Sequence, residues 1–351
     1  MYLIKKSQVS DIAKELQKEY QVYGPVIDKE TKQTMFVKAE NLADIDLAAP
    51  IPAIPPKHTL FPHFERIMSY DYDQKAQKVD IKTDFDNQPK ALFGLRSCDL
   101  TGVLCMDRFF LGQEFVDDVY KNHRKKMFIV TNTCNLPFKQ CFCVCTDSGP
   151  SAREGYDMNL TEMGDQYLVE VGSDKGKALA EKMGLAKADD SYKKKKDEVV
   201  DKSIDNFDMI AKDNKAWVSR VVNRVTTGLI DEKVWEYIGN QCVECGACTF
   251  VCPSCTCFNI ADSCTSASGA DRLRTWDSCA YEGYTRMAGG HNPRKPVEDR
   301  RSKRFFCKLS YSQSKKYLRP GCVGCGRCQW VCPGDIGLPN VVTYIRREIQ
   351  K

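Results

Sequence analysis

The run Cys242-Val-Glu-Cys245-Gly-Ala-Cys248-Thr-Phe-Val-Cys252-Pro253 decides the fold of the C-terminal part of this chain. It occurs a second time as Cys322-Val-Gly-Cys325-Gly-Arg-Cys328-Gln-Trp-Val-Cys332-Pro333. Both runs fit the pattern C-x2-C-x2-C-x3-C-P of bacterial ferredoxins. Three thiolates, each separated by two residues, can wrap a tight loop around one face of a [4Fe–4S] cluster. The two runs therefore predict two [4Fe–4S] clusters.

The ligands of the two clusters are expected to cross between the runs, because the fourth cysteine of each run binds the other cluster in such pairs. Gly246 and Gly326 follow the second cysteine of each run and can adopt a positive φ close to a cluster. Crossed ligation would join two distant stretches of chain and place the clusters close enough for direct electron transfer. The expected ligand sets are Cys242, Cys245, Cys248 and Cys332 for one cluster, and Cys322, Cys325, Cys328 and Cys252 for the other.

Zinc is the alternative interpretation of the two runs, because paired CxxC motifs can form a zinc site with four cysteine ligands. A zinc ribbon takes two cysteines from each of two runs, whereas each run here offers four and ends in proline. A zinc-stabilised interaction module would be colourless, while thiolate-ligated iron–sulfur clusters absorb visible light. The two complete copies favour iron–sulfur clusters.

The composition is that of a soluble globular protein with an unusual number of cysteines. The chain has 351 residues, 42% hydrophobic content, 28% charged content and a net charge of +5. That bias is too weak to indicate nucleic-acid binding. The chain is too large to need its nineteen cysteines as a disulfide scaffold. The N-terminus resembles no signal peptide and no apolar run is long enough to span a membrane. We therefore expect a cytoplasmic protein whose thiolates bind metal.

Two domains are expected, and together they place the protein in the α+β class. Residues 1–235 should form a mixed α/β N-terminal domain, and residues 236–351 a ferredoxin-like, mainly helical C-terminal domain. Hydrophobic periodicity predicts an amphipathic helix from Ile4 to Tyr20 and a helical region from Asp205 to Ile238. Short apolar runs predict strands at Lys78–Ile81, Ala91–Leu95, Met127–Thr131 and Gln166–Val171.

The N-terminal domain has cysteines of its own, at Cys98 and in the segment from Cys134 to Cys145. Four cysteines in twelve residues exceed any packing need, and Pro137 with the Gly149-Pro150 turn indicates an irregular loop. We therefore expect a third [4Fe–4S] cluster here. In the alternative interpretation several of these residues are buried free thiols. The expected ligands are Cys98, Cys134, Cys141 and Cys143, with Cys145 as a substitute.

Several further segments resemble a known family, the iron–sulfur subunits related to the β subunit of sulfhydrogenases and to an iron–sulfur subunit of anaerobic sulfite reductase. The resemblance covers most of the chain. The segments that carry it are Pro56-Lys57 through Phe61-Pro62 and Glu65, Arg96-Ser97-Cys98-Asp99-Leu100, Asp107-Arg108-Phe109-Phe110, Cys141-Phe142-Cys143, Cys252-Pro253-Ser254-Cys255-Thr256-Cys257, and Gly289-Gly290-His291-Asn292-Pro293-Arg294.

The resemblance implies a subunit that relays single electrons inside a larger oxidoreductase. One partner would be a flavoprotein that uses NAD(P)H. The other would be a catalytic subunit resembling a hydrogenase, a sulfite reductase or a heterodisulfide reductase. No G-x-G-x-x-G follows a strand, so the nicotinamide site should lie on another chain. We expect no catalytic residue in this chain. The alternative is a self-contained reductase in which a cluster or the thiols of Cys255 and Cys257 act on a substrate.

Other residues allow both a functional and a plain interpretation. Cys255 and Cys257 either face a partner or substrate or pack around a cluster. The basic segment from Arg294 to Arg304 either meets an acidic flavoprotein or is a solvated loop, and the Lys193–Lys196 run is expected to be a solvated face. Carboxylates that could serve in acid–base chemistry, although such groups are usually structural, are Glu65, Asp99 and Asp107. Cysteines that fit no pattern are Cys105, Cys264, Cys279 and Cys307.

Overall fold

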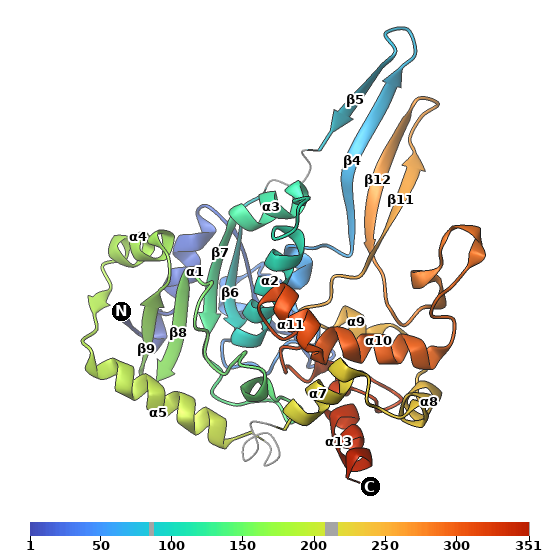
Figure 1. Cartoon of the computed structure of the whole chain (residues 1–351). Coiled ribbons are helices and arrows are strands. Elements are labelled where there is room, and N and C mark those ends of the chain that lie inside the picture. The colour runs from blue at the N-terminus through green and yellow to red at the C-terminus, as the bar shows by residue number, and fades with distance from the viewer. Residues whose placement is uncertain (84–87, 208–216, 351) are drawn as a thin grey trace.

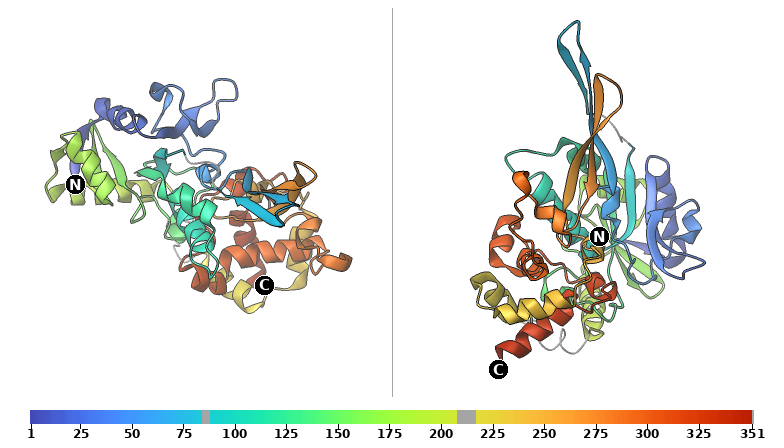
Figure 2. Two further views of the ribbon diagram at one scale, coloured as in Figure 1. Left: turned by 90° about the horizontal axis from the view of Figure 1, so that it is seen from above. Right: turned by 90° about the vertical axis from the view of Figure 1, so that its right-hand side faces the viewer.

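The computed structural model describes residues 1–83, 88–207 and 217–350 of the chain. It has a mixed α/β body, a long β-arm that projects from this body, and a helical region that contains the C-terminus (Figure 1). The right-hand view of Figure 2 also shows the arm projecting from the body. No helix in the described ranges is long and apolar enough to cross a membrane.

The body is built on an eight-stranded sheet with the order β10-β1-β9-β8-β7-β6-β2-β3. Its central strands β2, β6, β7 and β8 run parallel to their neighbours in this group. Both β6 and β7 are buried almost throughout, as expected for parallel strands covered on both faces. The strands are β1 Tyr2–Lys5, β2 Gln21–Ile27, β3 Thr34–Lys38, β6 Lys90–Arg96, β7 Met127–Asn132, β8 Met158–Met163, β9 Gln166–Val171 and β10 Ala186–Lys187.

Two apolar cores cover the faces of this sheet. Side chains alternate along β6, so Phe93 packs with α1 on one face and Leu92 packs with α2 on the other. Helix α2 follows β6 without a loop, so Cys98 lies in its first turn. The helices of this part are α1 Ser10–Gln17, α2 Ser97–Phe110, α3 Asp118–Lys125, α4 Asp174–Lys182 and α5 Ser191–Asp205.

The arm is a four-stranded antiparallel sheet made from two hairpins that lie far apart in the sequence. Strands β4 (Phe64–Asp73) and β5 (Lys78–Lys82) form one hairpin, and β11 (Phe258–Cys264) and β12 (Gly269–Trp276) form the other. Pairing of β4 with β12 joins the hairpins side by side (Figure 1). The arm thus joins the N-terminal part of the chain to the segment between the two cysteine runs.

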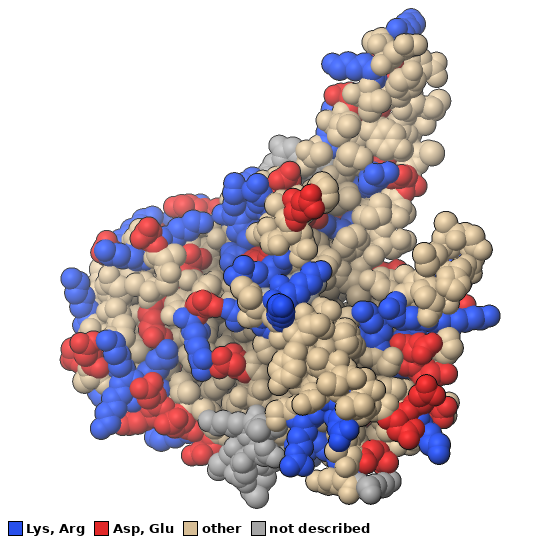
Figure 3. Space-filling model, viewed as in Figure 1, with Lys and Arg blue, Asp and Glu red and all other residues tan. Residues whose placement is uncertain are grey.

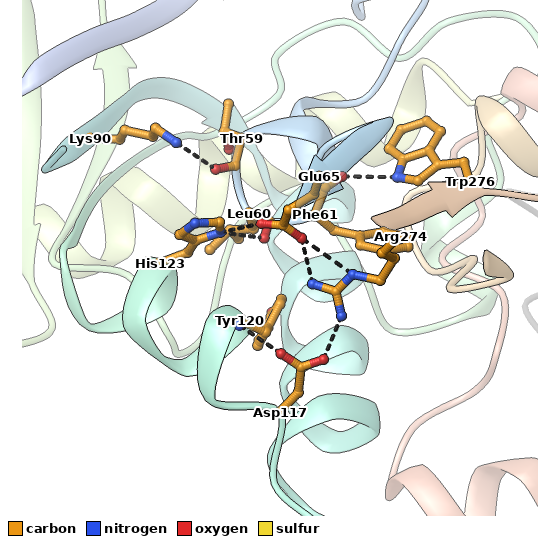
Figure 4. A network of polar contacts seen from close by, with 10 residues as sticks. All are labelled: Thr59, Leu60, Phe61, Glu65, Lys90, Asp117, Tyr120, His123, Arg274 and Trp276. Atoms are coloured by element: carbon orange, nitrogen blue, oxygen red, sulfur yellow. Dashed lines mark hydrogen bonds and ion pairs between the residues drawn. The ribbon is translucent and has the colours of Figure 1, made fainter. Parts of the chain in front are cut away.

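A buried network of charges anchors the base of the arm (Figure 4). Arg274 on β12 donates to Glu65 on β4 through Nε at 3.2 Å and Nη2 at 2.6 Å. Its remaining Nη1 forms an ion pair with Asp117, which caps α3 by accepting from the Tyr120 amide. Arg274 is 1% exposed, so its charge depends on these two carboxylates. The network fixes both hairpins to α3.

The C-terminal region contains short helices around an apolar core that includes Phe305 and Val342. Its helices are α7 Ser219–Thr227, α8 Glu232–Asn240, α9 Ala247–Phe250, α10 Val297–Leu309, α11 Tyr311–Tyr317, α12 Arg327–Trp330 and α13 Leu338–Ile349. Short 3-10 helices in the chain are η1 Lys6–Gln8, η2 Leu42–Asp44, η3 Pro56–Thr59, η4 Cys143–Cys145, η5 Glu282–Thr285 and η6 Ala288–Gly290.

The four strands predicted from apolar runs are present as β5, β6, β7 and β9. The predicted helix over 4–20 is wrong at its start, because Tyr2–Lys5 pairs as β1 with β9 and the helix begins only at Ser10. The helical region over 205–238 is divided between α7 and α8, and its residues 208–216 lie outside the described residues. The C-terminal domain, expected to be mainly helical, also contains the antiparallel hairpin β11–β12.

The division near residue 235 stays a prediction, and α8 runs across that position. The basic segment from Arg294 to Arg304 is not a solvated loop, because most of it lies in α10 and Arg300, Arg301 and Arg304 are buried. The Lys193–Lys196 run lies on α5, where its first three lysines are exposed.

Substitution of the arm's anchoring arginine should destabilise the protein strongly. Arg274→Ala leaves the buried Glu65 carboxylate without its arginine and with only His123 beside it, at 3.6 Å, and loss of one partner of a buried ion pair typically costs about 3–5 kcal/mol. Urea unfolding of the anaerobic protein, followed by circular dichroism, measures the shift. Arg272→Ala on the same strand is the control, because its pair with Asp262 is half-exposed and should contribute little. Equal shifts for the two variants would show that the buried network does not anchor the arm.

Candidate metal centres

The first cysteine set consists of Cys242, Cys245, Cys248 and Cys332. Cys242 lies close enough to Cys248 and to Cys332, the last cysteine of the other run, for their charges to raise its pKa. Gly246 begins α9 with φ +74°, and this left-handed conformation turns the chain between Cys245 and Cys248. The fourth cysteine of the second run thus lies with the first run.

The second set, Cys322, Cys325, Cys328 and Cys252, has the same construction. Cys322 lies within electrostatic range of the other three. Gly326 begins α12 with φ +73°. Backbone amides also face the sulfurs, because Gly324 N lies 3.3 Å from the Cys322 Sγ and Leu338 N lies 3.3 Å from the Cys328 Sγ. Amide donors of this kind tune the potential of a thiolate-bound cluster.

The third set consists of Cys98, Cys134, Cys141 and Cys143, which line one small cavity of about 30 Å3. Cys98 comes from the first turn of α2 and the others from the loop after β7. Cys145 is not among the residues that line this cavity. Burial raises the pKa of Cys141 to about 12 and that of Cys98 and Cys143 well above the ordinary value. Thiols with a raised pKa stay protonated at neutral pH unless a bound metal displaces the proton.

The third set is in direct contact with the second. The amide of Phe142 donates to the Gly324 carbonyl at 2.8 Å, and the Cys141 Sγ lies 3.6 Å from the Cys325 carbonyl. A Cβ on Gly324 would lie 2.5 Å from the Cys143 Cα, so only glycine permits this approach of the two backbones. The second set also lies beside the first, because Cys328 is within electrostatic range of Cys248.

A buried ion pair holds the second and third sets together. Arg327 lies between Cys325 and Cys328, and Asp99 follows Cys98. The guanidinium donates to both carboxylate oxygens of Asp99, at 2.6 and 2.9 Å, and to the Pro52 carbonyl at 2.7 Å. Neither side chain is exposed by more than 1%. A bidentate pair of this kind fixes both the distance and the orientation of the two elements.

The donor sets fit iron–sulfur clusters. No disulfide links any of the cysteines in the described part of the chain. Within the described part of the chain, no three His, Cys, Asp or Glu side chains come close enough together to hold a single metal ion. A [4Fe–4S] cube binds each thiolate through a different iron, so its ligands lie further apart than those of one ion. All three sets offer soft sulfur donors; three cysteines of the third set are buried, and amides are aimed at sulfur in the second.

The carboxylates considered for acid–base chemistry all bind cations. Asp99 pairs with Arg327, and Glu65 pairs with Arg274. Asp107 accepts from the Tyr120 hydroxyl at 2.8 Å and from the Arg124 Nε at 3.1 Å. Their geometry gives each of them a structural role.

A second, larger cavity brings Cys255 and Cys257 together with three cysteines that fit no sequence pattern. It has a volume of about 180 Å3. No spacing rule could have found this group, because its members come from four separate segments of the chain. We call it the thiol cavity, and its cysteines are Cys105, Cys255, Cys257, Cys279 and Cys307.

Comparison with known proteins identifies a domain family and a curated relative. The sequence model of the 4Fe-4S dicluster domain family matches residues 241–336. Sulfhydrogenase 2 subunit beta of Pyrococcus furiosus is 32% identical over 334 residues, which cover 93% of this chain and 93% of that protein. No solved structure matches the chain.

Substitution of Gly324 should cost more than the strain of its positive φ alone, because the Cys143 backbone lies so close. Gly324→Ala places a Cβ against Cys143 and should separate the two loops, so the protein should lose both stability and iron. Gly164→Ala is a matched control, because its φ of +68° is similar to the +64° of Gly324 but its Cβ meets nothing within 4 Å. Thermal unfolding and iron analysis of both variants check this. Equal losses would mean that only the strained φ matters.

Proposed function

This chain belongs to the family of the sulfhydrogenase β subunit, and we propose that it relays single electrons within a multi-subunit oxidoreductase. One partner would be a flavin- and NAD(P)H-dependent subunit. The other would be a catalytic subunit resembling a hydrogenase, a sulfite reductase or a heterodisulfide reductase. The chain itself would supply no bond-making residue for this relay.

The observation that carries this proposal is the continuous row formed by the three cysteine sets. Cys248 of the first set lies near Cys328 of the second, and Cys325 of the second lies near Cys98, Cys141 and Cys143 of the third. Clusters held in such a row would exchange electrons directly, because only a thin layer of protein would separate each cluster from the next. We assign each set as the four ligands of one [4Fe–4S] cluster.

The bound clusters would supply reversible one-electron chemistry. The chain's own residues provide binding, insulation and charge balance. Arg301 approaches the Cys248 Sγ at 3.8 Å through Nη1, and Arg304 donates to the Cys248 carbonyl at 2.8 Å. These buried cations offset the negative charge of thiolate-bound iron and so favour the reduced state.

Both ends of the row reach the protein surface. Next to the first set, Cys245 is exposed and Val243 is 64% exposed. At the other end, Leu136 lines the cavity of the third set and is 76% exposed. An electron could therefore enter at one end and leave at the other, as a relay between two partners requires.

The projecting arm is a candidate contact for a partner subunit. It exposes Phe64, Val79, Ile81 and Ile260. On the face shown in Figure 3 much of its surface is uncharged, between scattered charged side chains of both signs. Apolar side chains on a projecting element are typical of protein–protein interfaces. The buried network at its base would hold the arm in place for such a contact.

Iron and acid-labile sulfide analysis of the anaerobically purified protein tests this function. Three clusters predict about twelve irons per chain, because each cube contains four. Cys98→Ser or Cys141→Ser should lower the count, while Cys264→Ser should not, since Cys264 is exposed on β11 away from the three sets. About eight irons in the wild type, unchanged by Cys98→Ser, would restrict the clusters to the ferredoxin motif.

A further inference from the structure

The thiol cavity lies beside the proposed relay but belongs to none of its three sets. Cys255 in its wall lies next to Cys252 of the second set, because the Cys255 amide donates to the Cys252 carbonyl at 3.3 Å. Arg304 connects the cavity to the first set, because one of its nitrogens lies 3.9 Å from the Cys255 Sγ and another bonds the Cys248 carbonyl. The cavity is therefore close to two of the proposed clusters.

Two thiols in the lining of this cavity interact with each other. Cys257 follows the first cysteine run, Cys279 follows β12, and both side chains line the cavity. Two thiols that share one cavity wall can form a disulfide once their sulfur atoms meet.

The rest of the lining selects a small anion. Among the residues that the structure describes, no Asp or Glu lines the cavity, whereas five basic side chains do: Arg294, Arg300, Lys303, Arg304 and Lys308. Arg294 and Lys303 are partly exposed, so the cavity opens to solvent among positive charges. Such a concentration of one sign of charge attracts anions. A volume of 180 Å3 equals that of about six water molecules, at about 30 Å3 each.

We propose that Cys257 and Cys279 form a redox-active dithiol that reduces a small anionic disulfide bound in the thiol cavity. One thiolate attacks a sulfur of the substrate, so a mixed disulfide forms and the first product thiol leaves. The second thiolate attacks the mixed disulfide, which forms the Cys257–Cys279 disulfide and releases the second product thiol. The two thiol protons go to the two products, and the dithiol loses two electrons.

Re-reduction of the Cys257–Cys279 disulfide takes two electrons and two protons. Only this part rests on the proposed function, since the adjacent relay would supply the electrons one at a time. The exchange step itself needs no cluster chemistry. A single turnover starting from the reduced dithiol can therefore be measured whether or not the relay proposal holds.

The test uses two small disulfides of opposite charge on the reduced, anaerobic holoprotein. Dithiodiglycolate carries two carboxylates and cystamine carries two ammonium groups. After alkylation of the remaining thiols, mass spectrometry should find the Cys257 and Cys279 peptides linked. We expect dithiodiglycolate to react about tenfold faster than cystamine, because the cavity concentrates anions. Lys303→Gln should reduce this preference.

Substitutions distinguish a redox-active dithiol from two thiols that only pack against each other. Cys279→Ser should retain the probe as a mixed disulfide on Cys257, because no second thiol resolves it, and its iron content should equal that of the wild type. Failure of dithiodiglycolate to link Cys257 with Cys279, or equal rates for both probes, would overturn the proposal. A loss of about four irons in Cys279→Ser would also overturn it, since that result would make the cavity a further cluster site.

Discussion

The ion pair between Arg327 and Asp99 is the constraint on which the rest of the arrangement depends. Each residue is next to a cysteine that we assign to a cluster, Cys328 and Cys98 respectively. The pair is buried and bidentate, so it fixes the second cysteine run against the start of α2. It reinforces the backbone contact at Gly324, where the ferredoxin loops meet the α/β body. The proposed electron row across the two parts of the chain depends on this fixed position.

Buried positive charge is the second general feature of the molecule. Helix α10 buries Arg300, Arg301, Arg304 and Lys308, and all four side chains reach the cysteine segments, Arg300 through the Glu244 carboxylate. Cations are costly to bury unless negative groups lie beside them. Iron-bound thiolates would provide this negative charge, so α10 and the cysteine sets depend on each other. The same helix supplies cations of the thiol cavity, which joins the relay and the proposed dithiol in one electrostatic environment.

Local patterns predicted the parts of the structure that local chemistry decides. The spacing from Cys242 to Pro253 contains the loop geometry of a ferredoxin, and the matching family model agrees. Long-range pairing could not be predicted, because the two hairpins of the arm come from distant parts of the chain and the cysteines of the thiol cavity share no spacing. The basic segment of α10 could be taken for a solvated loop, because so many charges in a short stretch usually lie on a surface. Nothing in that segment indicates that buried thiols lie opposite.

The magnetic coupling of the reduced clusters tests the central claim most directly, because paramagnets interact only at short range. The measurement is EPR of the fully reduced, anaerobic protein, with temperature and power dependence, for the wild type and for Cys98→Ser. Three neighbouring clusters in a row predict a broad, fast-relaxing spectrum of coupled spins, which simplifies when Cys98→Ser removes one end of the row. A wild-type spectrum of isolated, uncoupled clusters that Cys98→Ser leaves unchanged would contradict the account.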